Sequence, residues 1–211
     1  MRVVMLGTGT GVGKTYVTAQ LAAALRPRQR VLALKPIETG VGAGEGGDAG
    51  AIAAGAGHQP LLSTWRFGHP VSPHLAAADQ QSCIDVGAVG AWVAEQERRV
   101  QPDITLIETA GGAFTPLGRG TTNVDLALAL EPGLWLLVAP DALGVLHDVG
   151  ATLRALPRRP DALVLSSARP RDASSGRNAG SLRELGIAEV LAALGPGSSD
   201  LRAVVAWLES Q

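Results

Sequence analysis

A nine-residue stretch, Gly7 to Thr15, constrains the fold of this chain more than any other part of the sequence. It reads Gly-Thr-Gly-Thr-Gly-Val-Gly-Lys-Thr, it follows the apolar run 3–6, and a helical pattern starts directly after it. Glycines allow successive backbone N–H groups to turn around an anion, and the start of a helix directs its positive dipole end to the same place. This order of strand, glycine-rich loop, Lys-Thr and helix predicts a phosphate-binding loop.

The spacing of this loop differs from the common form G-x-x-x-x-G-K-(S/T). One more residue lies between Gly7 and Gly13 than that form allows. The Lys14 ammonium is expected to neutralise the outer phosphates of a nucleotide, and the Thr15 hydroxyl to bind Mg²⁺. The alternative interpretation is a glycine-rich turn that carries a lysine by chance.

Short apolar runs without polar alternation recur along the chain, and helical patterns separate them. After the first, they occupy 31–34, 104–107, 134–138 and 162–165. Strands of this kind are typical of a parallel sheet that is buried on both faces. The predicted fold class is therefore α/β, with a parallel central sheet and helices on both faces as in P-loop NTPases, in a single domain over 1–211.

Ligands of such sheets bind at the carboxyl ends of the strands. This rule places four segments along one edge, called the rim from here on: 7–15, 35–39, 108–114 and 140–144. The polar stretch 168–180 shows no apolar periodicity and is expected to be a surface loop.

Lysine is used at two positions only, Lys14 and Lys35, whereas arginine supplies the other basic residues. A lysine ammonium is a compact, rotatable charge, and a guanidinium is a planar fork. Both lysines follow apolar runs, so we expect each where that difference matters. Lys35 would lie beside the phosphate loop if the first two strands are close neighbours, and there it would stabilise charge on a substrate or a transferring phosphoryl group.

Two carboxylates are candidates for Mg²⁺ binding. Glu108 ends a buried strand before a glycine-bearing loop; its alternative role is to cap the next segment or pair with Arg119. Asp48 stands before the alanine-rich stretch 49–56, where it is also a candidate N-cap. The hydroxyls of Thr10 and Thr39 are predicted to enter the same space.

Composition restricts the partners. The net charge of −1 gives no reason to expect a nucleic acid or a membrane surface, and no apolar run reaches the ~18 residues of a membrane span. Cys83 is the single cysteine, which fits a reducing cytoplasm.

Several ordered motifs resemble those of the dethiobiotin synthetase family. The long phosphate loop is similar to Gly-Thr-x-Thr-x-Val-Gly-Lys-Thr, and Lys35-Pro36-Ile37-Glu38-Thr39-Gly40 is similar to Lys-Pro-x-x-(Ser/Thr)-Gly. Ser72-Pro73-His74 resembles the family's Ser-Pro-His, and 108–112 resembles Glu-Gly-Ala-Gly-Gly. The resemblance extends from residue 3 to about 150 and is weak beyond 160.

This resemblance implies a biotin-synthesis ligase that uses ATP and Mg²⁺. One amine of 7,8-diaminononanoate takes up CO₂ as a carbamate, the carbamate attacks the γ-phosphate, and the second amine closes the cyclic urea. The products are dethiobiotin, ADP and phosphate.

The resemblance also implies a role for each matching residue. The catalytic residues would be Lys35, Lys14 and Thr10. The nucleotide-binding residues would be Gly11, Val12, Gly13, Lys14, Thr15, Tyr16 and Ser166. The substrate-binding residues would be Thr10, Lys35, Thr39, Gly111, Gly112, Gly144, Val145 and Leu146. Mg²⁺ would be held by Thr15, Asp48 and Glu108. The substrate carboxylate would meet the helix start at 143–147 of a second subunit, so a homodimer is expected.

The sequence departs from the family pattern at three places. Thr109 replaces a glycine, His147-Asp148 stands where Asn-His is usual, and Ser166-Ser167 stands where an asparagine often reads adenine. The last departure leaves the preferred nucleotide base open.

Other ATPases of the same class are the alternatives. One is a cobyrinate-type amide synthetase, and another is a nucleotide-gated regulatory ATPase. A partitioning ATPase would have an extra lysine early in the phosphate loop, and a GTPase would need Asn-Lys-x-Asp, which a chain without lysine after Lys35 lacks.

Overall fold

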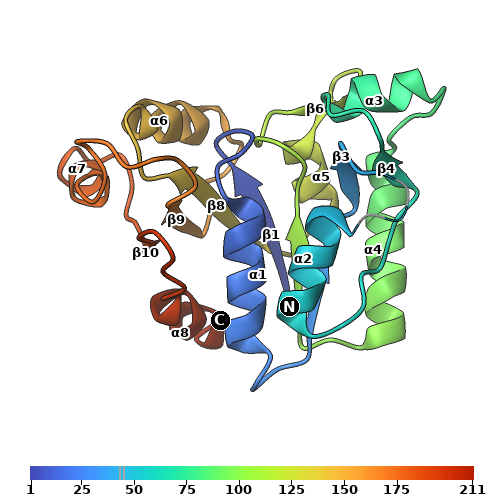
Figure 1. Ribbon diagram of the computed structural model, residues 1–211, viewed down its shortest axis with the longest axis horizontal. Helices are drawn as coiled ribbons and strands as arrows, with labels where there is room; N and C mark the ends of the chain where they lie inside the picture. The colour runs from blue at the N-terminus through green and yellow to red at the C-terminus, as the bar shows by residue number, and fades with distance from the viewer. Residues whose placement is uncertain (43, 45) are drawn as a thin grey trace.

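The computed structural model describes residues 1–42, 44 and 46–211. Over this part of the chain, six parallel strands form the central sheet in the order β10-β9-β8-β1-β5-β2 (Figure 1). The strands are β1 (Arg2–Gly7), β2 (Val31–Leu34), β5 (Ile104–Glu108), β8 (Leu134–Pro140), β9 (Ala162–Ser166) and β10 (Ala192–Ala193). The predicted parallel α/β sheet is confirmed.

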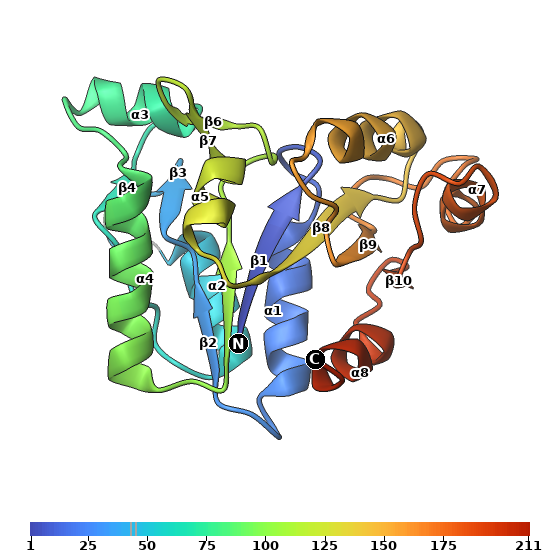
Figure 2. The same ribbon diagram turned by 180° about the vertical axis from the view of Figure 1, so that it is seen from behind.

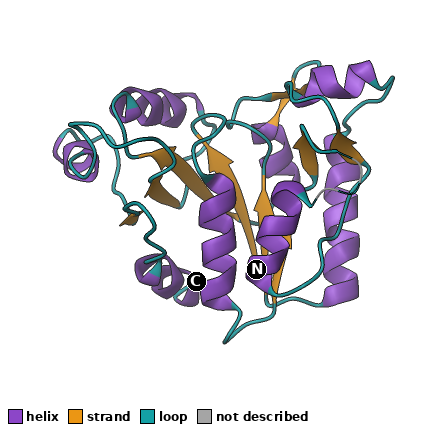
Figure 3. Cartoon of the chain, viewed as in Figure 1, coloured by secondary structure: helices purple, strands orange, loops and turns teal. Residues whose placement is uncertain are grey.

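Helices cover both faces of this sheet, as Figure 3 shows with strands in orange between helices in purple. The helices on the face seen in Figure 1 are α1 (Lys14–Leu25), α2 (Gly47–Ala56) and α8 (Arg202–Glu209). Those on the face seen in Figure 2 are α4 (Val86–Val100), α5 (Asn123–Ala129) and α6 (Val145–Ala155). Two shorter helices, α3 (Pro73–Asp79) and α7 (Asn178–Glu184), lie at the periphery.

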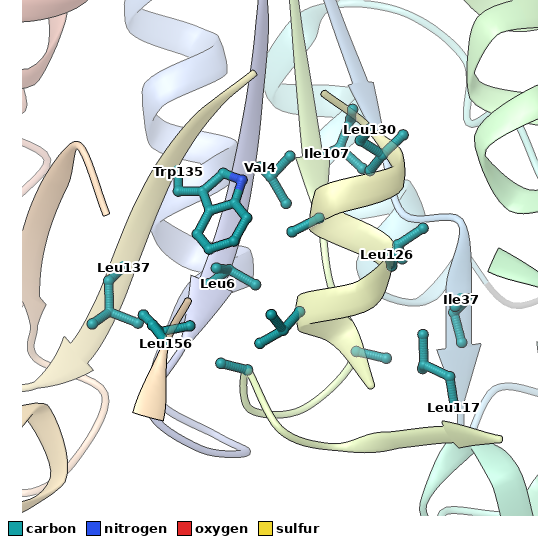
Figure 4. Packing of buried hydrophobic residues seen from close by; sticks show 14 of the residues in the cluster. Val4, Leu6, Ile37, Ile107, Leu117, Leu126, Leu130, Trp135, Leu137 and Leu156 are labelled. Atoms are coloured by element: carbon teal, nitrogen blue, oxygen red, sulfur yellow. The ribbon is translucent and has the colours of Figure 1, made fainter. Parts of the chain in front are cut away.

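The sequence of the central strand β1 has no polar alternation because helices cover the sheet on both faces. Val3 and Met5 belong to the hydrophobic cluster that α1 and α8 cover. Val4 and Leu6 belong to the cluster on the opposite face, where Trp135 of β8 also lies (Figure 4). Both faces of the strand are buried, so both sets of alternating side chains are apolar.

Two pairs of short strands were not predicted. β3 (Ile37–Thr39) pairs in parallel with β4 (Trp65–Phe67), and β6 (Pro116–Gly118) pairs antiparallel with β7 (Thr121–Thr122). Segments of two or three residues are too short to show a period of two in the sequence. The β3-β4 pair lies at the rim, just after β2 in the sequence and close to the start of α2 (Figure 1).

Three local predictions need correction. Asp48 is not the N-cap of its helix, because α2 already begins at Gly47 and its N-cap is Gly46. β1 and β2 are not neighbours, since β5 lies between them. The stretch 168–180 is a loop only as far as Asn178, where α7 begins.

None of the helices in the described ranges is both long enough and apolar enough to cross a membrane.

Candidate active site

The phosphate loop joins β1 to α1 with the backbone conformation that its glycines permit. Gly11 and Gly13 have φ values of 69° and 89°, and Gly13 is the N-cap of α1. A Cβ atom on Gly13 would lie 2.7 Å from Ser166 Oγ, so the close packing of β9 against the loop also requires glycine there. Glycine at these positions therefore permits the turn that the loop makes into α1.

Lys14 is 5% exposed at the first position of α1. Burial lowers the pKa of its ammonium to about 8; attraction by Glu108 opposes this shift and repulsion by Lys35 adds to it. A buried cation whose desolvation is only partly compensated is suited to bind an anion such as a phosphate.

Two predicted nucleotide-binding residues support the loop from neighbouring segments. Ser166 Oγ is buried and donates a hydrogen bond of 2.6 Å to the carbonyl of Val12. Tyr16 is partly exposed, and its hydroxyl donates to the carbonyl of Ser198 at 3.0 Å. Ser167 is turned away and donates to the carbonyl of Gly195. In this arrangement Ser166 braces the loop, while Tyr16 links α1 to the segment before α8.

Lys35 lies in the middle of a charged cluster at the rim. Its Nζ is 2.7 Å from Asp48 Oδ2 and 2.6 Å from Glu108 Oε1. The Thr15 hydroxyl donates to the same Glu108 oxygen at 2.8 Å. We call Thr15, Lys35, Asp48 and Glu108 the rim cluster; the structure brings all three predicted metal ligands together in it.

Two members of the rim cluster, Lys35 and Asp48, keep their charges at neutral pH. Burial alone would lower the Lys35 pKa, but the charges and hydrogen bonds of Glu108 and Asp48 outweigh it, and the pKa is raised. Burial alone would raise the Asp48 pKa, but Lys35 outweighs it with help from Thr15, and that pKa is lowered. Lys35 is therefore an ammonium, and Asp48 is a carboxylate.

Glu108 fits a role in Mg²⁺ binding. Its side chain is 0% exposed, and its Oε2 is buried without a hydrogen-bond partner in the part of the chain that the structure describes. Its other oxygen bonds Lys35 and Thr15, and Arg119 is not among these partners. An unpartnered buried carboxylate oxygen is costly, and a cation would compensate it.

The donor set also suits this ion. Mg²⁺ prefers oxygen ligands, and it usually takes one or two carboxylates with phosphate and water instead of a complete protein cage. Thr15, Asp48 and Glu108 supply one hydroxyl and two carboxylates. No group of three His, Cys, Asp or Glu residues placed to hold a metal occurs among the described residues.

The loop after Glu108 packs directly on the phosphate loop. A Cβ atom on Gly112 would lie 3.0 Å from Gly9 Cα, and Ala113 N–H donates to the Gly7 carbonyl at 2.7 Å. Gly112 N–H donates to Thr115 Oγ1. Gly112 is thus needed for close approach of two backbones, in addition to its predicted place near the substrate.

Two further residues hold this loop: Asn123, which the sequence analysis did not single out, and Thr109. The buried amide of Asn123 donates to the carbonyls of Ala110 and Gly112 at 2.5 and 2.8 Å. Thr109, a departure from the family pattern, is buried, and its hydroxyl donates to the Met5 carbonyl at 2.8 Å. The added hydroxyl is therefore used inside the sheet and does not enter the site.

The remaining predicted substrate residues lie further along the rim. Thr10 is exposed on the phosphate loop, and Thr39 is half-buried at the end of β3. Gly144 is the N-cap of α6 with a φ of 97°, and Val145 begins the helix. The exposed Leu143 just before them donates its N–H to Asp172 Oδ2 at 2.8 Å. Leu143 and Gly144, just before the helix, are exposed, and Asp172 links this segment to the loop 168–177.

Comparison with known proteins extends this picture. A family model described as an AAA domain (AAA_26) matches residues 1–201. A protein of Saccharopolyspora erythraea named ATP-dependent dethiobiotin synthetase BioD is 39% identical over 156 residues, which cover 74% of this chain and 68% of that protein. The protein of the same name from Streptomyces coelicolor is 34% identical over 204 residues, covering 94% and 85%.

Solved structures share the fold at low sequence identity. The hydrogenase maturation factor HypB from Archaeoglobus fulgidus aligns with a TM-score of 0.56 at 14% identity, covering 100% of this chain and 89% of that one. Chloroplast FtsY from Physcomitrella patens aligns with a TM-score of 0.59 at 16% identity, covering 98% and 64%.

The parallel sheet, the glycine-rich loop and its lysine define a P-loop NTPase. Within this class, the chain belongs to the dethiobiotin synthetase family.

Proposed function

We propose that this protein is an ATP- and Mg²⁺-dependent cyclo-ligase that converts 7,8-diaminononanoate and CO₂ into dethiobiotin, with release of ADP and phosphate. The observation that carries the proposal is the second buried lysine. Lys35 contacts Glu108, and Glu108 contacts Thr15 of the phosphate loop. Binding of a nucleotide requires only one lysine, Lys14. A second ammonium next to it is suited to a reaction in which another anion attacks the γ-phosphate, because it stabilises the added negative charge.

The chemistry divides into three steps. One amine of the substrate attacks CO₂ and loses a proton, which gives a carbamate. A carbamate oxygen attacks the γ-phosphorus, and the bond to the β–γ bridging oxygen breaks to release ADP. The second amine then attacks the carbamate carbon and loses a proton, and phosphate leaves as the ring closes.

Each residue of the site has a role in these steps. Lys14 neutralises the β- and γ-phosphates, and Lys35 attracts the carbamate and the moving phosphoryl group. The raised pKa of Lys35 keeps it protonated, so it acts through its charge and does not take a proton from the amines. Thr10 and Thr39 orient the carbamate and the amines.

Mg²⁺, held by Thr15, Asp48 and Glu108, would supply charge neutralisation of the phosphate oxygens. The unpartnered Glu108 Oε2 supports this assignment.

We further infer a homodimer, a cytoplasmic location and a single domain over 1–211. The homodimer follows the family pattern, in which a second copy brings its Gly144–Leu146 segment to the substrate carboxylate; Leu143 and Gly144 are exposed in this chain, as such a contact requires. Asp148 lies in the first turn of the same helix, where its negative charge would weaken the binding of a substrate carboxylate unless its side chain faces away from it.

We expect low selectivity for the base of the nucleotide. A cavity of about 280 Å³ at the carboxyl end of β9 is lined by Ser167, Arg169, Arg171 and Gly195, among others. The Ser167 hydroxyl is already bonded to Gly195 and carries no amide to pair with adenine. We expect CTP and GTP to support turnover at a KM within about tenfold of that for ATP, a difference of ~1.4 kcal/mol. Turnover with ATP alone would contradict this.

The function is tested by product formation. Protein, Mg-ATP and bicarbonate are incubated with and without 7,8-diaminononanoate, and phosphate and dethiobiotin are both measured. We expect phosphate release that depends on the diamine and equals the dethiobiotin formed. Phosphate release that ignores the diamine would favour a nucleotide-gated regulatory ATPase, and dependence on a different amine-accepting acid would favour an amide synthetase.

A further inference from the structure

Glu38, the middle residue of β3, is a buried carboxylate that touches the start of α2. It is 2% exposed. Its Oε1 accepts hydrogen bonds from the backbone N–H groups of Asp48 at 2.5 Å and Ala49 at 3.3 Å. Its Oε2 accepts from Nε of Arg66, the residue opposite it on β4, at 3.1 Å. One side chain thus joins the β3-β4 pair to the helix.

This contact replaces a cap that α2 lacks. The N-cap residue of α2 is Gly46, which has no side chain to accept a hydrogen bond. The first N–H groups of a helix have no partner inside the helix, and a carboxylate there also complements the positive end of the dipole. Glu38 therefore caps α2 from a different element, nine positions before the helix starts.

Gly47 is adapted to the same contact. It has a φ of 54°, and a Cβ atom at this position would collide with Glu38 Oε1 and lie 2.7 Å from Val41 Cγ1. Glycine is therefore required at position 47 both for the backbone conformation and for the approach of the carboxylate.

The first turn of α2 also carries Asp48, whose carboxylate reaches Lys35. Glu38 holds the backbone N–H of Asp48, and Asp48 Oδ2 lies 2.7 Å from Lys35 Nζ. Arg66, Glu38, Asp48 and Lys35 form a continuous chain of hydrogen bonds and ion pairs from β4 to the rim cluster. The position of the Asp48 carboxylate depends on this chain, since α2 has no side-chain cap of its own to fix its first turn.

We propose that Glu38, buttressed by Arg66, is a positioning residue that sets the Asp48 carboxylate for Mg²⁺ and for Lys35. Glu38 touches neither nucleotide nor substrate and acts through the start of α2. The inference rests on the proposed role of Asp48 at the Mg²⁺ site, and it applies to nucleotide binding whether or not the diamine is the substrate.

The test compares metal-dependent ADP binding in four variants of the full chain. ADP is titrated by calorimetry with and without Mg²⁺, and the ratio of the two affinities is the readout. For Glu38→Ala we expect this ratio to fall about tenfold, as is common when a residue that orients a metal ligand is lost. Gly47→Ala should give the same loss, because its methyl group displaces the carboxylate. Affinity for ADP without Mg²⁺ should stay within about threefold, since the phosphate loop is unchanged.

Glu38→Gln and Glu97→Ala are the matched controls. The amide oxygen of Gln can still accept from Asp48 and Ala49, so we expect it to restore most of the Mg²⁺ effect. Glu97 also pairs with an arginine, Arg2, but at the far end of the sheet. Its loss should lower the melting temperature and leave the Mg²⁺ effect unchanged.

The proposal is overturned if Glu38→Ala behaves as Glu97→Ala does, with lower stability and an unchanged Mg²⁺ effect. If Glu38→Ala does not fold, Gly47→Ala and Glu38→Gln decide: an unchanged Mg²⁺ effect in Gly47→Ala overturns the proposal, and a loss that Gln does not share supports it. Failure of the ligase assay in the wild-type chain would affect the proposed function alone, because ADP binding needs no diamine.

Discussion

The two ends of the sheet each carry a buried or partly buried group of opposite charges, and the two groups are built differently. At the rim, the single ammonium of Lys35 lies between Asp48 and Glu108. At the other end is what we call the basal pair, Arg2 with Glu97. Arg2 Nε and Nη2 bond the Glu97 carboxylate at 2.9 and 2.7 Å, and Nη1 donates to a backbone carbonyl at 3.1 Å.

The difference lies in what each group leaves unsatisfied. The planar guanidinium matches both oxygens of Glu97, so the basal pair has little capacity to bind anything else. In the part of the chain that the structure describes, the point charge of Lys35 leaves Glu108 Oε2 without a hydrogen-bond partner. Lysine is used where a charge must be shared with ligands, and arginine where a pair must be complete. The rim cluster is therefore built to bind ligands, and the basal pair is built to stabilise the fold.

The largest expected effect is that of Lys35→Arg on turnover. A planar fork cannot take the place of a compact ammonium between two carboxylates, so the charge moves away from the reacting phosphoryl group. We expect kcat to fall on the order of 10²–10³-fold, the usual cost of losing such a contact. Dethiobiotin formation measures it, and calorimetry with ADP should show binding within about threefold of wild type. Unchanged turnover would mean that Lys35 is structural.

Glu108→Gln should separate function from stability at the rim. The amide oxygen can still accept from Thr15, and Lys35 retains Asp48, so we expect the loss of unfolding free energy to stay below the roughly 3–5 kcal/mol that a buried charge left without any partner costs. The Mg²⁺ concentration for half-maximal turnover should rise about tenfold or more. Urea unfolding and Mg²⁺ titrations measure the two effects. A large loss of stability with normal Mg²⁺ dependence would place Glu108 in the structural class.

Glu97→Gln should give the opposite result at the basal pair. It weakens a partly exposed, bidentate ion pair, which is worth up to about 1 kcal/mol. We expect a loss of unfolding free energy of that size and kcat and KM equal to those of the wild-type chain. Lower turnover in this variant would show that the two ends of the sheet are coupled.

The smallest effect is the pH dependence of that stability difference. Burial alone would raise the Glu97 pKa, but hydrogen bonds from Arg2 and Thr105 and the charge of Arg2 lower it below 4.5. A carboxylate with a lowered folded pKa stabilises the protein above its unfolded pKa, and loses this contribution as pH falls through the folded value. Wild type and Glu97→Gln should therefore differ at pH 7 and converge in urea unfolding as the pH falls below the folded pKa of Glu97. A stability difference between the two proteins that does not change with pH would mean that Glu97 acts through packing and not through its charge.

Much of the fold was predictable, because the information lies in contiguous residues. The strands at 31–34, 104–107, 134–138 and 162–165 are confirmed by β2, β5, β8 and β9. Their short apolar runs without polar alternation are the signal of strands buried on both faces. β3 and β4 are each three residues long and gave no such signal.

The site was predictable as a set of residues but not as a network. Lys35, Asp48 and Glu108 follow from their places at strand and helix ends, yet their pairing depends on β5 lying between β1 and β2, which spacing does not encode. Glu38 was missed because a cap is normally sought next to the helix it serves. Its link to Asp48 passes through space, between a short strand and a helix.

The position of β1 has a consequence for how the chain is made. Val3 pairs with Leu106 of β5 and with Leu134 of β8, and Thr8 N–H donates to the Val138 carbonyl. The phosphate loop therefore leaves the ribosome early, but the strand that carries it has only β5 as a neighbour until β8 has been synthesised to residue 140. A nascent chain halted before β8 would contain the whole motif but lack one of the two strands that flank β1, together with the hydrogen bond from Thr8 to Val138. Nucleotide capture by stalled chains of increasing length would thus report completion of the sheet centre, not the presence of the motif.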